Sequence, residues 1–118
     1  MAWISTDDVT PSIRFTQSSV PYKRLDGAIV ADSWDTLTEG NFDNPISMAE
    51  TGEFIGGLPI WTNTSPNGET GTEHDCTGWT QEVGSALIGL SNETQLGLWT
   101  LSEFLDCEQS ARLYCFEQ

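Results

Sequence analysis

The sequence predicts a single α+β domain over residues 1–118, with short irregular antiparallel strands, one short helix and long loops. Three observations predict it. The apolar runs are short, and segments rich in Gly, Asn, Asp and Pro separate them. One segment, residues 32–40, carries both a start and a stop signal for a helix. At 118 residues the chain is long enough for a modest core and too short for two domains.

The N-terminal quarter is predicted to contain a short strand, a loop and a hairpin. Residues 2–4 (Ala-Trp-Ile) favour a short strand, whereas residues 5–19 lack periodicity and are expected to be mostly loop. Asp26-Gly27 lies between the short apolar runs of residues 22–30. Because Asp-Gly readily adopts the positive φ angles of a two-residue turn, we expect a tight hairpin there.

A short helix is predicted over residues 32–40. Asp32 or Ser33 can accept backbone N–H bonds as the N-cap, and Gly40 can end the helix. Trp34 and Leu37 share one face of such a helix because they are three residues apart. We therefore expect about two turns, laid on a sheet by these two side chains.

The rest of the chain is predicted to alternate between short strands and polar loops. Residues 44–55 indicate a second hairpin, and residues 58–62 indicate a strand whose Pro59 suits a sheet edge. Residues 63–75 are almost all turn formers, and loops this long are usually functional or tethered. Further strands are expected at residues 86–90, 97–100 and 113–116.

The charge balance is strongly acidic. There are 18 Asp and Glu against 4 Lys and Arg, a formal net charge of -14. Such a surface repels phosphate backbones, heparin-like polyanions and anionic lipid head groups, so neither nucleic acid nor a membrane surface is expected as a partner. No stretch approaches the about 20 apolar residues of a membrane helix, and no secretory signal is visible at Met1. Because the carboxylates are dispersed, they favour a solvated surface.

Most of the tryptophans are expected in the core. A domain of this size has few other bulky side chains to bury. The four expected core tryptophans are Trp34, Trp61, Trp79 and Trp99.

No residue pattern indicates a catalytic site or a cofactor. The single histidine, His74, lies in a polar loop with Glu69, Glu73 and Asp75, residue types that can bind zinc or calcium. An exposed acidic loop explains the same residues without a metal. One histidine without motif context does not make a catalytic triad, and any carboxylate pair chosen from 18 acids is arbitrary.

The most specific motifs are Cys76-Thr-Gly-Trp79 and the terminal run Leu113-Tyr-Cys115-Phe. Weaker matching segments are Ala2–Ser5, Asp26-Gly27, Asp32–Leu37 with Gly40, Gly52, Ile60–Thr62, Ser65–Gly68 and Cys107. Together they resemble the endostatin-like branch of the C-type-lectin-like superfamily, which contains collagen-derived endostatin and bacterial secreted lectin-like domains. The resemblance implies a C-type-lectin-like fold and an extracellular binding role.

The resemblance also implies a disulfide between Cys76 and Cys107. In that family the cysteine before the tryptophan pairs with the one ahead of the last strand. Loop entropy gives a similar but looser answer, since three cysteines allow three single bridges. A bridge between Cys107 and Cys115 closes a very short loop. A bridge between Cys76 and Cys107 closes a longer one, and the unfolded-state entropy that it removes stabilises the fold by about 3–4 kcal/mol.

In that family the cysteine of the last strand pairs with one in an N-terminal helix. That helix, and a strand before it, would precede Ala2, so we expect an N-terminally truncated domain. Cys115 is then either a reduced, buried thiol, or the partner in an intermolecular bridge or in a bond lost by truncation. Trp3 and Phe116 would border an uncovered apolar seam.

The resemblance does not extend to metal-dependent binding. Calcium-dependent sugar binding needs paired carboxylate and amide ligands, and the nearest segments here lack them. Those segments are Asn44-Pro45-Ile46, Ser65-Pro66-Asn67 and Leu98-Trp99-Thr100. Endostatin's zinc ligands lie mostly ahead of anything present here, so that site is not carried over.

The sequence predicts a non-enzymatic recognition or adhesion module, secreted or on the cell surface, that binds a protein or glycan ligand through loops 63–75 and 91–97. The candidate ligand-binding residues are Asn63, Asn67, Glu69, Glu73, His74 and Asp75. One alternative is a structural assembly subunit, joined to itself or to a partner chain through Cys115 and the seam at Trp3. Another is a metal-dependent hydrolase that uses His74 and nearby acids.

Overall fold

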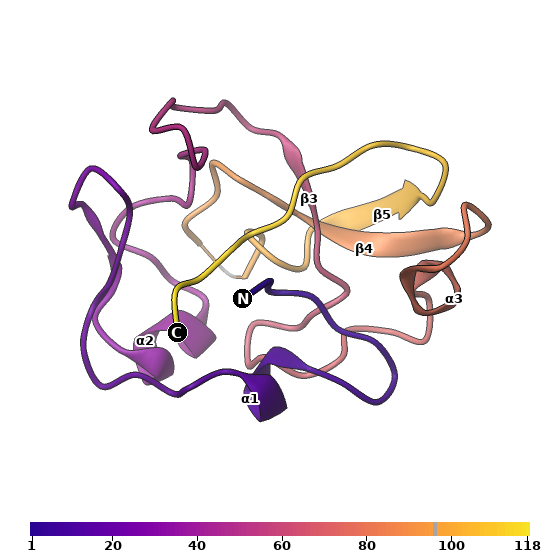
Figure 1. Ribbon diagram of the computed structural model, residues 1–118, viewed down its shortest axis with the longest axis horizontal. Coiled ribbons are helices and arrows are strands. Elements are labelled where there is room, and N and C mark those ends of the chain that lie inside the picture. The colour runs from indigo at the N-terminus through magenta and orange to yellow at the C-terminus, as the bar shows by residue number, and fades with distance from the viewer. Residues whose placement is uncertain (96) are drawn as a thin grey trace.

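The computed structural model describes residues 1–95 and 97–118, which form two antiparallel sheets and three short helical segments (Figure 1). The helical segments are α1 (Pro11–Arg14), α2 (Trp34–Glu39) and α3 (Cys76–Trp79). The strands are β1 (Tyr22–Lys23), β2 (Ile29–Ala31), β3 (Pro59–Trp61), β4 (Ser85–Leu90) and β5 (Glu103–Asp106). These elements confirm the predicted α+β class.

The larger sheet is centred on β4, which pairs antiparallel with β3 on one side and with β5 on the other. The strand predicted at residues 86–90 agrees with β4 to within one residue. The middle of β4 is buried, and strands pair with both of its edges. Pro59 has no N–H to donate and begins the outer strand β3, the position predicted for it.

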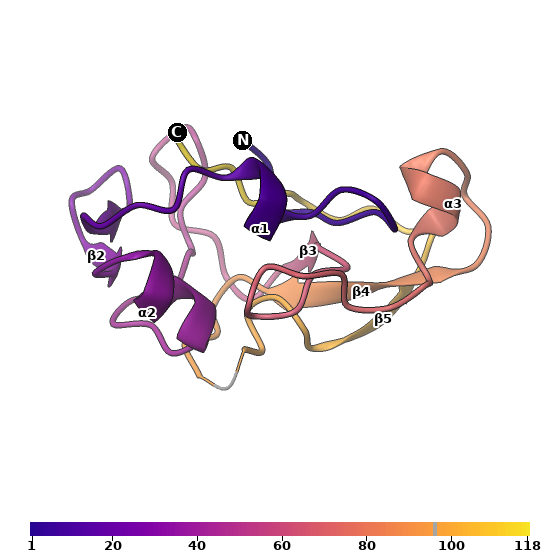
Figure 2. The same cartoon turned by 90° about the horizontal axis from the view of Figure 1, so that it is seen from below.

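The two ends of the chain add to the sheet beyond β3. Arg112 forms a parallel bridge with Ile60 of β3, and Ala2 forms an antiparallel bridge with Cys115. The N-terminal and C-terminal segments therefore run side by side, and both termini lie on the same side of the molecule (Figure 2). Neither segment is stable as a strand alone, so each depends on the other for backbone hydrogen bonds.

Strands β1 and β2 form the predicted hairpin with a different turn. The Arg24 N–H donates to the Ala28 carbonyl, and the Gly27 N–H donates to the Arg24 carbonyl, both at 2.9 Å. Within this loop only Gly27 has a positive φ, +86°, whereas the predicted two-residue turn also needs one at Asp26. The Asp26 carboxylate instead accepts the Ala28 N–H at 3.2 Å and pairs with Arg24 at 2.7 Å. Hydrogen bonding from Arg24 lowers the pKa of Asp26. These contacts favour a three-residue loop.

Helix α2 confirms the predicted start and stop signals. The Ser33 hydroxyl accepts the Thr36 N–H at 3.3 Å as the N-cap, and Gly40 ends the helix with φ of +79°. Trp34 and Leu37 are both buried and belong to the main core. The helix packs against β2, so these two side chains attach it to the smaller sheet.

Residues 97–100, predicted as a strand, form a turn. Gly97 has φ of +72°, and its carbonyl accepts the N–H groups of Thr100 at 3.0 Å and Leu101 at 2.9 Å. The turn places Trp99 and Thr100 in the interior, where both are fully buried. The apolar character of this segment therefore reflects burial rather than a strand.

Three other predicted segments are reduced to isolated bridges. They are residues 2–4 and 113–116, joined through Ala2 and Cys115, and residues 44–55, joined through Met48 and Phe54. Conversely, α1, α3 and β5 lie in segments where no element was predicted. α1 and β5 are only four residues long, too short to carry a hydrophobic period that sequence reasoning could detect.

The main core is aromatic, and Trp3 lies inside it with 0% exposure. Its ring contacts those of Phe15, Trp34, Trp99 and Phe116 at centroid distances of 5.6, 5.8, 4.8 and 6.0 Å. The prediction that Trp3 borders an uncovered apolar seam is therefore wrong. Phe15, the residue after α1, and the paired C-terminal segment cover this ring.

Buried hydroxyl groups connect the core to the loop after β3. The Thr100 hydroxyl accepts the Trp3 indole N–H at 2.8 Å and donates to the Thr64 carbonyl at 2.8 Å. The hydroxyls of Ser5 and Thr64 are bonded to each other at 2.8 Å. All four residues are fully buried. Because an unpaired polar group there is unfavourable, this network fixes how the N-terminal segment lies on the loop.

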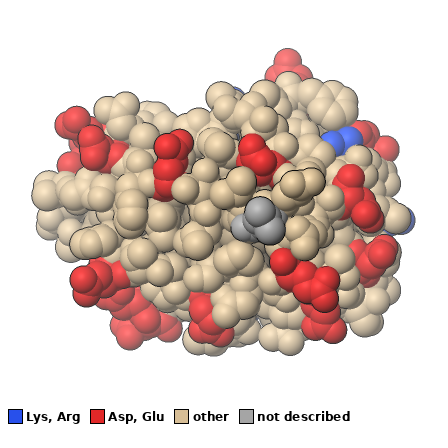
Figure 3. All heavy atoms as spheres, turned by 180° about the vertical axis from the view of Figure 1, so that it is seen from behind, with Lys and Arg blue, Asp and Glu red and all other residues tan. Residues whose placement is uncertain are grey.

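Acidic side chains are dispersed over the face of the molecule drawn in Figure 3, as the sequence predicted for the surface. Figure 3 shows Asp and Glu scattered over the back of the molecule, with few Lys or Arg. Two of the basic residues are engaged within the fold: Arg14 donates to the Ala2 and Ile4 carbonyls at 3.1 and 2.8 Å, and Arg24 pairs with Asp26. In the part of the chain that the structure describes, no helix has the length and apolar character to cross a membrane.

The buried phenol of Tyr114 should make the protein less stable at alkaline pH. Its side chain is buried, and its hydroxyl has no hydrogen-bond partner among the described residues. Burial raises the pKa of Tyr114 far above its usual value, so the phenol ionises first in the unfolded chain. The contribution of Tyr114 to the free energy of unfolding is fully present below pH about 10 and is lost progressively above it. At pH 11, ionisation of this phenol in the unfolded chain should lower the free energy of unfolding by about 1.4 kcal/mol.

Tyr114→Phe tests this dependence, because it removes the ionisable hydroxyl and keeps the ring. Urea unfolding of both proteins at pH 7 and pH 11 gives the comparison. We expect the variant to match or slightly exceed the wild type at pH 7, since no hydrogen bond is lost. An equal alkaline loss in both proteins would contradict the assignment to Tyr114.

Candidate functional site

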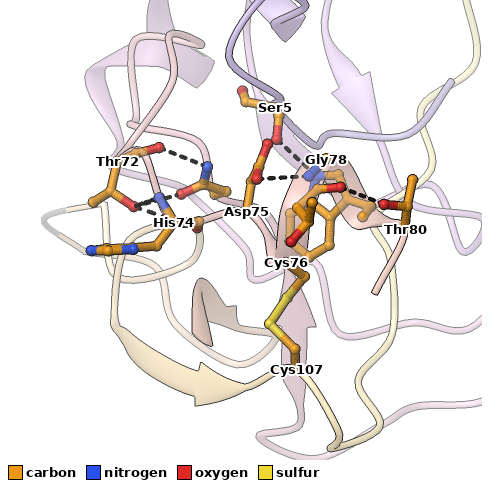
Figure 4. Close-up of a disulfide and its surroundings, with 11 residues drawn as sticks. Ser5, Thr72, His74, Asp75, Cys76, Gly78, Thr80 and Cys107 are labelled. Atoms are coloured by element: carbon orange, nitrogen blue, oxygen red, sulfur yellow. Dashed lines mark hydrogen bonds between the residues drawn. A yellow bond between two sulfur atoms is a disulfide. The ribbon is translucent and has the colours of Figure 1, made fainter. Parts of the chain in front are cut away.

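A disulfide joins Cys76 to Cys107, the pairing that the family resemblance implied (Figure 4). The S–S distance is 2.05 Å and the two Cα atoms are 5.7 Å apart. The bond connects the start of α3 to the residue that follows β5. It therefore ties the end of the loop 63–75 to the larger sheet.

Segment α3 is a single turn of left-handed helix. Its four residues, Cys76, Thr77, Gly78 and Trp79, have φ values of +54°, +57°, +65° and +63°. Glycine adopts this conformation freely, whereas each of the other residues costs about 1–2 kcal/mol. The surrounding contacts, the disulfide among them, have to hold the turn against this strain.

Asp75 caps the left-handed turn. Its carboxylate accepts the Gly78 N–H at 2.8 Å (Figure 4), and its carbonyl accepts the Trp79 N–H at 2.8 Å. Asp75 is only 6% exposed, so it is not an exposed ligand-binding residue as the sequence suggested. The N–H groups that begin a helical turn need an acceptor, and this carboxylate supplies one.

Two hollows border α3. The first, which we call the tryptophan hollow, has a volume of about 470 Å³ and is lined by Ile4, Trp61, Trp79, Gln81, Glu82 and Leu113, together with the disulfide. The second, the acidic hollow, has a volume of about 380 Å³, and its lining includes Asp7, Glu73, His74, Asp75 and Val83. The lining of the first combines aromatic and apolar side chains with the polar side chains of Thr80, Gln81 and Glu82, and the second carries three carboxylates.

Trp61 of β3 and Trp79 of α3 form one corner of the tryptophan hollow. Their ring centroids are 5.6 Å apart and the ring planes meet at 62°. Both side chains are half-buried against a small cluster of Cys76, Cys107 and Ala86. The core prediction holds for Trp34 and Trp99, whereas Trp61 and Trp79 lie at the edge of a separate cluster.

The Trp79 ring is held in place from its polar edge. Its indole N–H donates to the Ser5 carbonyl at 2.8 Å. Ser5 is fully buried and its backbone N–H bonds the Thr62 carbonyl at 2.9 Å, next to Trp61. The N-terminal segment therefore positions both tryptophans relative to each other.

Asn63, predicted as a ligand-binding residue, is fully buried. Its amide donates to the Thr72 carbonyl at 3.0 Å and accepts the Thr72 hydroxyl at 3.1 Å. The φ of Asn63 is +42°, a conformation that asparagine tolerates better than most residues. Asn63 thus closes the base of the loop instead of facing solvent.

The other predicted ligand-binding residues are exposed but separated. Asn67 and Glu69 lie in a turn closed by the Gly68 N–H bond to the Ser65 carbonyl. That turn lines neither hollow. Glu73 and His74 line the acidic hollow. The structure therefore brings together only part of the predicted set.

In the second predicted ligand loop, residues 91–97, the described residues line neither hollow. Ser91 is fully buried, and its hydroxyl accepts the Leu58 N–H at 3.0 Å and donates to the Gly56 carbonyl at 2.6 Å. Leu96 lies outside the described residues. The base of this loop thus serves to anchor the segment before β3.

The donor groups near His74 do not converge. Within residues 1–95 and 97–118, no three His, Cys, Asp or Glu side chains are arranged to hold a metal ion. The His74 ring instead packs against Phe104 of β5, with centroids 6.0 Å apart. This geometry gives no support to the hydrolase alternative.

Cys115 is a free thiol and is exposed, which excludes one of the alternatives that the sequence left open, a reduced and buried thiol. Its neighbours Tyr114 and Phe116 are buried and half-buried, respectively. Side chains of an extended segment alternate between faces, so Cys115 faces solvent. The exposed thiol remains compatible with an intermolecular bridge.

The tryptophan hollow was not predicted from the sequence. One signal pointed toward it, because Trp79 closely follows a cysteine expected to be in a disulfide. Trp61 is remote in sequence, and its contact with Trp79 depends on the pairing of β3 with β4 and on the handedness of α3. Only Gly78 hints locally at a left-handed turn.

No model of a known family matches the chain, and neither a curated protein nor a solved structure does. The α+β architecture and the disulfide are observed directly. The endostatin-like, C-type-lectin-like assignment stays a prediction.

Proposed function

We propose that the protein is a non-enzymatic recognition or adhesion module, secreted or on the cell surface, that binds a protein or glycan ligand at the tryptophan hollow. The observation that carries the proposal is the pair of half-buried tryptophans in an open hollow with a polar margin. Large rings that combine apolar faces with polar edges are enriched at binding sites. The disulfide is typical of proteins in oxidising compartments.

The scaffold supports binding because it fixes the hollow before a ligand arrives. The disulfide forms part of the lining, Trp61 comes from a strand, and Trp79 is held by its bond to Ser5. A preorganised site loses less conformational entropy on binding than a mobile loop does. The exposed residues of the loop 63–75, Glu73 and His74 among them, would provide secondary contacts.

Array binding with matched variants tests the proposal. Oxidised protein would be screened on glycan and protein arrays, and hits would be followed by tryptophan fluorescence. We expect Trp61→Ala to weaken binding at least about tenfold, the range of a central aromatic contact. Phe54→Ala serves as the control, because Phe54 is 67% exposed and lies outside the hollow. Absence of any hit, or equal losses in both variants, would contradict this function.

A second candidate function is assembly through Cys115, which the exposure of its thiol favours. An intermolecular disulfide at this position would join two chains without help from Trp3, which is buried. Non-reducing mass measurement of the exported protein tests it. A covalent dimer that disappears in Cys115→Ser supports assembly, and a monomer with one reactive thiol rules it out.

A further inference from the structure

We infer that the tryptophan hollow takes a cation, the ammonium or guanidinium group of a basic peptide segment. The inference rests on the proposed function and specifies the ligand of the same site. It commits to a protein partner with exposed Lys or Arg and not to a neutral glycan.

The chemistry of the lining favours a cation. Trp61 and Trp79 present parts of two indole rings, and tryptophan is the strongest side-chain partner for a cation over its face. Glu82 is the only charged residue of the lining, and its charge is negative. A cation in this corner would therefore lie beside two indole rings and a carboxylate.

The polar edge of Trp79 is already occupied. Its indole N–H donates to the Ser5 carbonyl, so it is not free to bind a sugar hydroxyl. Trp79 therefore lines the hollow with its ring and not with a free indole N–H. A face binds an apolar surface or a cation, and the surrounding charge decides between them.

The charge of the molecule favours the cation. With 18 acidic against 4 basic residues, the protein attracts positive groups from solution. Arg14 and Arg24 are engaged within the fold, and Lys23 belongs to β1, which pairs with β2 at the opposite end from α3 (Figures 1 and 2). Arg112 is next in sequence to lining residues but does not line the hollow itself. A neutral ligand would gain nothing from this field.

The test uses two capped hexapeptides, one alternating lysine with serine and the other with glutamine in place of lysine. A neutral hexasaccharide is the third probe, and binding to the oxidised full chain is followed by calorimetry and tryptophan fluorescence. We expect the lysine peptide to bind, and to bind more weakly as salt is raised. The glutamine peptide and the sugar should bind at least about fivefold more weakly.

Two variants locate the binding. Glu82→Gln should weaken the binding of the lysine peptide about two- to fivefold, the effect of one exposed ion pair. Glu50→Gln is the matched control, since it changes the net charge equally and Glu50 is exposed outside the hollow. Trp61→Leu, which keeps an apolar side chain but removes the π face, should weaken the peptide at least about fivefold. Unfolding of each variant is measured alongside, and Glu82→Gln decides the outcome if Trp61→Leu is unstable.

The outcomes separate this inference from the proposed function. One outcome has the sugar bind, lose its binding in Trp61→Leu, and the lysine peptide fail to bind. The inference of a cation ligand would then be wrong, whereas the proposed recognition site would stand. Equal weakening by Glu82→Gln and Glu50→Gln would show that only diffuse charge attracts the peptide, which overturns the inference. If no probe binds and the arrays also give no hit, both proposals fail.

Discussion

Gly89→Ala should be among the most destabilising single substitutions in this chain. A Cβ atom at position 89 would lie 1.6 Å from the carbonyl oxygen of Trp99 and 2.2 Å from its carbonyl carbon. Trp99 cannot withdraw easily, because it is fully buried and its ring contacts those of Trp3 and Phe42 at 4.8 and 4.7 Å. We expect a loss of at least about 3 kcal/mol in the free energy of unfolding.

Urea and thermal unfolding measure the effect of Gly89→Ala. The expected loss corresponds to a fall of roughly 10 °C or more in Tm for a domain of this size. Gly56→Ala is the matched control, since no heavy atom lies within 4 Å of a Cβ built at Gly56. Its stability should change by no more than about 0.5 kcal/mol. If both variants unfold at the same urea concentration, the turn at residues 97–100 does not lie against β4 in solution.

The elements predicted correctly have their causes within a few residues. Ser33 and Gly40 begin and end α2, Gly27 turns the first hairpin, and Pro59 begins an outer strand. Backbone hydrogen bonding and φ preference act locally, so a short stretch of sequence is enough to indicate them.

The parts that were not predicted depend on distant partners. Trp3 is buried because Phe15 and the C-terminal segment meet around it. Trp99 was predicted to lie in a strand because its neighbours are apolar, whereas the turn at Gly97 places its side chain in the core. Neither outcome follows from a period of two or of 3.6 residues, since both result from packing across the whole chain.

The candidate site divides in the same way. Glu73 and His74 are exposed near the disulfide, as a polar loop beside a cysteine suggested. Asn63 and Asp75 belong to the same polar run but are buried, because they satisfy backbone groups at the two ends of the loop. Composition indicates that a segment is polar. It does not tell which of its polar side chains are buried and hydrogen-bonded within the fold and which face solvent.

The second large effect is expected from the disulfide. Replacing both Cys76 and Cys107 with alanine should lower the free energy of unfolding by about 3–4 kcal/mol, because the unfolded chain regains the entropy of the open loop. We also expect a local effect at the left-handed turn, because without the bond Cys76 loses its link to the residue after β5. Urea unfolding under non-reducing conditions measures the global loss.

Cys115→Ser is the matched control, because it removes a sulfur that is free and exposed. It should change stability by no more than about 0.5 kcal/mol. Amide hydrogen exchange resolves the local effect, with faster exchange expected at Trp79 and Gly78 in the double variant, whose N–H groups bond to Asp75. If the double variant kept both the exchange rates and the stability of the wild type, the hydrogen bonds of Asp75 alone would hold the strained turn. The tryptophan hollow would then keep its shape in a reducing compartment, and the disulfide would no longer support an extracellular role.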